Sequence, residues 1–151
     1  KTFTPHPAMS VVEKMVKEFG REGKKVSKGF YDYPENGEKH LWSDLTELYQ
    51  TTDEQPSQQD LVDRLLYVQA NETAKCFEEN VVRTVADANI GSIFGWGFAP
   101  NQGGTLQFIN SVGVDKFVAR SRGLAQKYGA RFEPAQILVA MAAKGEVFSD
   151  D

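Results

Sequence analysis

The chain has 151 residues, a net charge of −4, 40% hydrophobic and 25% charged residues. The length suits one domain with a substantial core, and the composition is ordinary for a globular protein. The acidic balance argues against a nucleic-acid partner, because phosphates select basic surfaces. No apolar run is long enough to span a bilayer, and we expect no signal peptide. A single cysteine, Cys76, fits a reducing, cytoplasmic location.

The first residue is Lys1, not methionine, so we expect a fragment or a processed product. Ser10 and Glu13 have the spacing of a capping box and predict a helix start. Apolar residues three and four positions apart then predict one helix face, and Gly20 predicts its end. That face comprises Val12, Met15, Val16 and Phe19.

Residues 21–56 are basic, then aromatic, then rich in turn residues, and we expect them to be largely extended. A short helix is predicted at 41–49, and 51–59 reads as a polar connector. Ser57 and Asp60 form a second cap signal, before the longest predicted helix. Its apolar face is predicted to contain Leu61, Val62, Leu65, Leu66, Ala70, Ala74, Phe77, Val81 and Val82.

Thr84 or Asp87 predicts the next helix start, and the following glycines predict its end. Short helices are predicted at 105–110, with a stop at Gly113, and from 114 to a stop at Gly129. Gly123 predicts a close helix crossing. A last helix is predicted from Pro134 to Gly145. Since no segment alternates as a strand, the sequence predicts an all-α fold.

Residues 87–113 combine six glycines with large apolar side chains. This composition is typical of backbone packed closely against protein. The segment fails the dinucleotide-binding pattern, because Pro100 takes the last glycine position and a predicted helix precedes it. Gly103 and Gly104 read as a tight turn, with anion binding as the alternative. The candidate packing or interface residues here are Phe94, Trp96, Phe98, Leu106 and Phe108.

We predict no catalytic, cofactor-binding or metal-binding residue in this chain. His6 and His40 lack partners at metal-ligand spacing, and no orienting group is apparent for either. Cys76 reads as a small packing residue. The acidic pairs at 78–79 and 150–151 read as solvated charges of a helix surface and of the tail.

A basic run at positions 21, 24, 25 and 28 precedes Phe30, Tyr31 and Tyr33. We interpret the run as a solvated loop whose aromatic side chains pack on the core or on a neighbouring chain. Phosphate contacts with aromatic stacking, or binding of coenzyme A, are the alternatives. Burial on a neighbouring chain would lead to self-association.

Four segments together resemble the C-terminal helical domain of the 3-hydroxyacyl-CoA dehydrogenase family. GREGKKVSKGFYDY is similar to its closing motif. FGWGFAP followed by GGTLQFINSVG, and FEPAQILVAMAAKGEVF, resemble the second copy of that domain in multifunctional enzymes of fatty-acid β-oxidation. An internal echo agrees: Phe3-Thr4-Pro5 and Phe132-Glu133-Pro134 each precede a predicted helix.

The resemblance implies three segments. Residues 1–50 would be the tail of a preceding helical repeat, 51–59 a connector, and 60–151 a complete repeat. The implied fold is that of the 6-phosphogluconate dehydrogenase C-terminal domain. In that family these domains pack against a Rossmann domain, help to close the acyl-CoA site and mediate dimerisation.

The resemblance implies that the parent oxidises 3-hydroxyacyl-CoA with NAD, using a His/Glu pair that this chain lacks. The isolated chain is therefore expected to bind no cofactor and to be inactive. Its implied partners are the Rossmann and first-repeat domains of the parent, and acyl-CoA reaches it only there. The alternative is a standalone helical dimerisation module.

Overall fold

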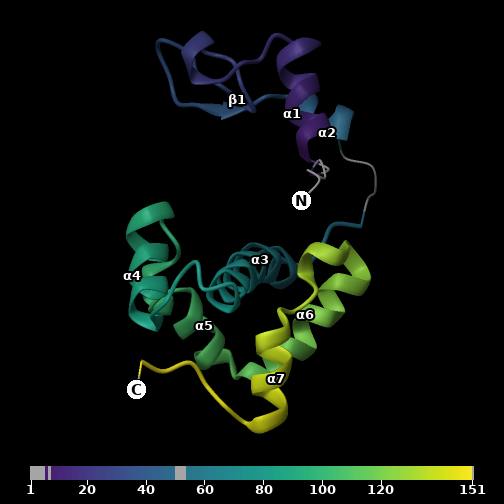
Figure 1. The fold of residues 1–151 in the computed structure, drawn as a ribbon. Helices are drawn as coiled ribbons and strands as arrows, with labels where there is room; N and C mark the ends of the chain where they lie inside the picture. The colour runs from purple at the N-terminus through teal and green to yellow at the C-terminus, as the bar shows by residue number, and fades with distance from the viewer. Residues whose placement is uncertain (1–5, 7, 50–53, 151) are drawn as a thin grey trace. The chain divides into compact units, whose positions relative to one another are not determined.

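The computed structural model describes residues 6, 8–49 and 54–150. The chain forms two compact units, Lys1–Gln55 and Pro56–Asp151. Most described residues are helical, and the described strands are two residues long, which confirms the all-α class (Figure 1). The expected roles of these segments as a repeat tail and a full repeat remain predictions. Phe3–Pro5 of the internal echo, positions 51–53 of the connector and Asp151 lie outside the described residues.

The described residues of unit 1 form two α-helices, a 3-10 turn and a minimal hairpin. Tyr31 pairs with Leu41 and Asp32 with His40 in the antiparallel hairpin. The prediction of extended chain missed this hairpin, because two-residue strands are too short to alternate. The elements are α1 (Ala8–Lys17), η1 (Lys24–Val26), β1 (Tyr31–Asp32), β2 (His40–Leu41) and α2 (Asp44–Tyr49).

The predicted start of α1 was wrong. The helix begins at Ala8, so Ser10 lies inside its first turn. His6 takes the capping role instead, because its Nδ1 accepts a hydrogen bond from the Ala8 N–H at 3.1 Å. Met15 is buried, whereas Val12 and Val16 of the predicted face are 51% and 42% exposed.

Unit 2 is a cluster of five α-helices around one apolar core. Phe117 lies at its centre: its ring stacks on Tyr67 at 4.4 Å and meets Phe108 edge-on at 6.1 Å. Leu106, Ile109 and Leu138 are fully buried beside it. The elements are α3 (Gln58–Glu78), α4 (Val85–Trp96), η2 (Pro100–Gln102), α5 (Thr105–Val112), α6 (Val114–Tyr128), η3 (Ala130–Phe132) and α7 (Gln136–Lys144).

Two predicted N-caps are confirmed. Ser57 Oγ accepts from the Asp60 N–H at 3.1 Å before α3, and Thr84 Oγ1 accepts from the Asp87 N–H at 3.0 Å before α4. The starts of α5 and α7 are capped from elsewhere in the fold. Asn89 Oδ1 accepts from the N–H groups of Leu106 and Gln107, and Glu78 Oε1 accepts from the Ile137 N–H.

The predicted buried face of α3 was wrong in its first half. Leu61, Val62 and Leu65 are 46%, 41% and 65% exposed. Asp63 takes the inner position at 9% exposure, because Arg120 on α6 donates to its Oδ2 at 2.6 Å. A pair of opposite charges therefore replaces apolar contact at this helix crossing.

Of two predictions from glycines, the end of α4 was correct only at the last glycine, and the helix crossing at Gly123 was wrong. Helix α4 continues through Gly91 and Gly95 and ends at Gly97, which has a left-handed φ of 77°. Ser92, fully buried against α5, accepts from the Thr105 N–H at 3.2 Å and supports the helix where glycine weakens it. At Gly123 an added Cβ would meet no atom within 4 Å, so no close helix crossing occurs there.

Candidate functional site

A groove of about 540 Å³ lies between α3 and α4 in unit 2. It stays open because α4 packs chiefly on α5. We call it the α3–α4 groove. It is lined by Gln69, Glu72, Thr73 and Cys76 on α3, by Val82, and by Asp87, Ala88, Gly91, Ser92, Gly95 and Trp96 on α4.

The α4 wall of this groove is bare backbone at two positions. Gly91 and Gly95 lie one turn apart, and a Cβ at either would meet nothing within 4 Å. Trp96 closes one end, and its Nε1–H donates to Gln69 Oε1 at 3.0 Å. Such a wall lets another backbone or a large side chain approach α4 closely.

Exposed apolar side chains of α4 and α3 adjoin the lining of the α3–α4 groove, to which Trp96 alone among them belongs. Phe94 is 86% exposed, and Ile90, one turn earlier, is 58% exposed. Trp96 is 56% exposed, and Leu65 lies one turn before Gln69 on α3. Single exposed apolar residues are common, but several grouped beside a groove are typical of a surface that contacts another protein.

The structure separates the residues of 87–113 that the sequence grouped together. Phe98, Leu106 and Phe108 lie in the core with exposures of 2%, 0% and 6%. Phe94 and Trp96 lie at the surface beside the α3–α4 groove. Helix periodicity would place 94 and 98 on one face, because they lie four residues apart. They separate because the helix ends at Gly97, between them.

The glycine-rich stretch does not fit a dinucleotide phosphate. Gly95 and Gly97 lie in and just after α4, and the described element directly before α4 is helix α3, not a strand. The Leu106 and Gln107 N–H groups after Gly104 already bind Asn89. A pyrophosphate would have to displace that side chain, so the tight-turn interpretation agrees with the structure.

Two acidic residues proved to be structural acceptors. Sequence patterns suggested solvated charges at 78–79 and 150–151. Instead Glu78 caps α7, and Asp150 accepts from the Val85 and Ala86 N–H groups at 2.5 and 2.7 Å. Their partners lie about 60 positions away in the chain, so local spacing carries no signal of them.

The basic run of unit 1 divides in the structure. Arg21 is 8% exposed; its Nε donates to the Gly29 carbonyl and its Nη2 to Asp32 Oδ1, both at 2.6 Å. Lys24, Lys25 and Lys28 are exposed. Phe30 is 43% and Tyr31 37% exposed, whereas Tyr33 is half-buried. Arg21 is thus committed to holding the unit together.

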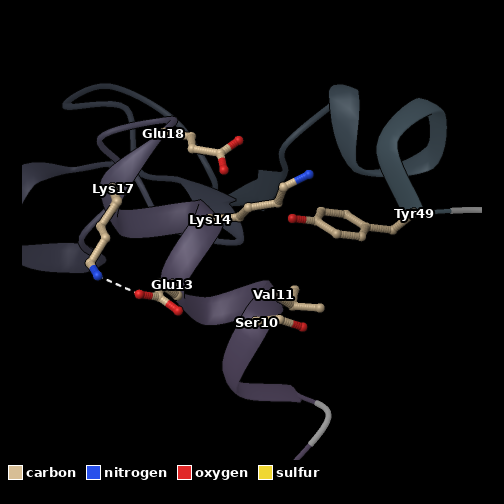
Figure 2. Close-up of a pocket in the computed structure, with 7 residues that line it drawn as sticks. All are labelled: Ser10, Val11, Glu13, Lys14, Lys17, Glu18 and Tyr49. Carbon is tan, nitrogen blue, oxygen red and sulfur yellow. Dashed lines mark hydrogen bonds and ion pairs between the residues drawn. The ribbon is translucent and has the colours of Figure 1, made fainter.

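A second pocket, of about 590 Å³, lies between α1 and α2 in unit 1. Figure 2 shows charged side chains of both signs around it, with an ion pair between Lys17 and Glu13. Lys14 and Tyr49 approach from opposite walls. The mixed charge favours no particular ligand. It is lined by Ser10, Val11, Glu13, Lys14, Lys17, Glu18 and Tyr49.

The ionisable cluster of unit 2 joins α3 to α6. Hydrogen bonds from Lys127, Arg120 and Tyr128 hold the pKa of Asp60 well below its usual range. Asp60 in turn raises the pKa of Lys127 and of Arg120. Asp60, Lys127 and Arg120 are thus each paired in the direction that favours the charged form. The cluster is therefore suited to stabilising the fold rather than to transferring a proton.

The described residues contain no group of three or more histidine, cysteine, aspartate or glutamate side chains arranged to hold a metal ion. Nor is any helix in the described part of the chain long and apolar enough to cross a membrane. No protein-family model matches the chain. The α3–α4 groove, with Phe94 and Trp96 beside it, is the strongest candidate for a functional surface.

Proposed function

We propose that this chain is the C-terminal helical part of an NAD-dependent 3-hydroxyacyl-CoA dehydrogenase of fatty-acid β-oxidation. It would supply packing surface for assembly and for closing the acyl-CoA site, and the catalytic groups would lie in another domain. The motif resemblance supports the family. The observation that carries the assembly role is the exposure of Phe94 and Trp96 at the end of α4, because both lie within the most specific motif, FGWGFAP.

The interacting surface would involve Phe94 directly. An aromatic ring buries about 150–250 Å² when covered, so its 86% exposure leaves a large unfavourable area in water. A neighbouring domain could place its own side chains against Gly91 and Gly95 while covering this ring. In the proposed parent, the neighbours are the Rossmann and first-repeat domains, and the location is cytoplasmic.

The test uses the polypeptide of the whole open reading frame that encodes this segment. We expect it to reduce NAD with (S)-3-hydroxybutyryl-CoA, and we expect the 151-residue chain alone not to do so. Phe94→Ser should weaken activity or assembly of the long polypeptide several-fold. Ala119→Ser, on an exposed position of α6, serves as the matched control. A long polypeptide without dehydrogenase activity would overturn the proposal.

A standalone dimerisation module is the second candidate. The exposed aromatic residues of both units favour it: Phe94 and Trp96 in unit 2, Phe30 and Tyr31 in unit 1. Sedimentation equilibrium of the chain should then show concentration-dependent association. Comparing Phe94→Ser with Phe30→Ser identifies the unit responsible. A monomer at the highest accessible concentration would exclude this function.

A further inference from the structure

The last described residues of the chain are tied to the first turn of α4. Asp150 accepts hydrogen bonds from the N–H groups of Val85 and Ala86, at 2.5 and 2.7 Å. Thr84 accepts from the Asp87 N–H, at 3.0 Å. The first three N–H groups of α4, which have no partner within the helix, are therefore satisfied, two of them by the chain end.

The segment that carries Asp150 is itself anchored. Phe148 is 6% exposed, and its ring meets that of Phe77 on α3 edge-on at 5.6 Å. The side chain of Asn110 on α5 binds the Phe148 backbone on both sides: Nδ2 donates to its carbonyl at 2.9 Å, and Oδ1 accepts from its N–H at 3.0 Å. Residues 146–150 thus connect α3, α5 and α4 after the last helix has ended.

We propose that residues 146–150 form a clasp that holds the N-terminal end of α4 and so sets the position of the α4 wall of the α3–α4 groove. At its far end, α4 is joined to α3 across the groove by the bond between Trp96 and Gln69. Releasing Asp150 frees the near end, where Val82, Asp87 and Ala88 line the groove opposite Cys76. The consequence for partners rests on the proposed assembly role of this groove.

The carboxylate of Asp150 is suited to a releasable contact. The carboxylate is exposed, so water or a cationic group can compete for it. Phe148, in contrast, stays buried as a fixed anchor. Its charge also interacts favourably with the partial positive charge at the start of α4. Loss of this contact would free the first turn of α4, the helix that forms one wall of the groove.

Cys76 provides a direct measurement, because it is the single cysteine of the chain and lines the groove on α3. Its reaction with the aromatic disulfide DTNB is followed on the whole chain without any partner. We expect the thiol of Asp150→Ala to react about five- to ten-fold faster than that of the unaltered chain. The reason is that loss of a side-chain cap makes local opening of α4 more favourable. Asp150→Asn, which keeps an acceptor oxygen, should be intermediate, and Ser149→Ala should leave the rate unchanged.

The urea dependence of the rate separates a clasp from a general loss of stability. Local opening of α4 gives an acceleration that is nearly independent of urea below the unfolding transition, whereas global unfolding gives one that rises steeply. Phe148→Leu is a second variant, and it should also accelerate the reaction. An unchanged rate in Asp150→Ala, or an acceleration that follows global unfolding in both variants, overturns the clasp. Neither outcome depends on whether the parent is a dehydrogenase.

Discussion

The two units of this chain are stabilised by different kinds of contact. In the described part of unit 1, Met15 is the one buried apolar side chain, and the buried Arg21 joins Gly29, Asp32 and the face of Trp42. Unit 2 has a continuous apolar core with Phe117 at its centre. A small unit that cannot bury much apolar surface can thus be organised by a single guanidinium with several partners.

Each unit contains one of the two tryptophans, Trp42 in unit 1 and Trp96 in unit 2. Replacing either by phenylalanine leaves a fluorescence reporter of the other unit. Urea unfolding with each reporter therefore measures the two stabilities separately, and the predictions below use this difference.

The largest effect is expected in the core of unit 2. Phe117→Ala removes a fully buried ring that stacks on Tyr67, and should lower the free energy of unfolding by about 3–5 kcal/mol. The Trp96 transition should move to much lower urea, and the Trp42 transition should stay in place. If both transitions moved together, the units would be one cooperative structure and the comparison would fail.

In unit 1, a substitution that keeps the charge should still lower the stability, as a core cavity does in unit 2. Arg21→Lys keeps the positive charge but loses the planar fork that reaches Gly29 and Asp32 together. We expect a loss of about 2–3 kcal/mol, seen in the Trp42 transition alone. Arg122→Lys on the exposed face of α6 is the control and should change neither transition. A tolerated Arg21→Lys would show that charge alone is sufficient.

The sequence predicted helices better than it predicted which of their faces are buried. The caps at Ser57 and Thr84 depend on residues only three positions apart, and both predictions are correct. The inner face of α3 was not predictable in this way. Asp63 is buried because of Arg120, 57 positions later, and apolar periodicity alone favours Leu61 and Leu65 instead.

The candidate surface was predicted in part. Aromatic residues among glycines indicated packing in 87–113, but only the structure separates Phe94 from Phe98. The acceptor roles of Asp150 and Glu78 lay beyond local patterns, since each caps a helix distant in the chain. Contacts of this kind depend on the tertiary fold, so no local sequence pattern indicates them.

The ionic contact between α3 and α6 makes unit 2 sensitive to acid. The pKa of Asp60 in the folded state lies below its ordinary value of 3.8, because Lys127, Arg120 and Tyr128 donate to it. Its contribution to stability is therefore complete above about pH 5 and decreases as the pH falls through 3.8 towards the lowered value. Asp60→Asn should flatten the dependence of the Trp96 transition between pH 5 and about 2. If the pH dependence of this transition were the same in the unaltered chain and in Asp60→Asn, Asp60 would not be the source of the acid sensitivity.

The smallest expected effect is a gain in the stability of unit 2. It tests whether a methyl group is tolerated where the structure leaves room for it. Gly123 lies inside α6 with nothing within 4 Å of an added Cβ, so Gly123→Ala should stabilise the unit by about 0.5–1 kcal/mol. Gly104 is the matched opposite. Its φ is +105°, and a Cβ would lie 2.4 Å from Asn89 Cα, so Gly104→Ala should destabilise and disturb the cap of α5. Both variants are followed by Trp96 fluorescence in urea. A loss of stability in Gly123→Ala would mean that another surface approaches α6 at this position, since nothing within unit 2 opposes the methyl group.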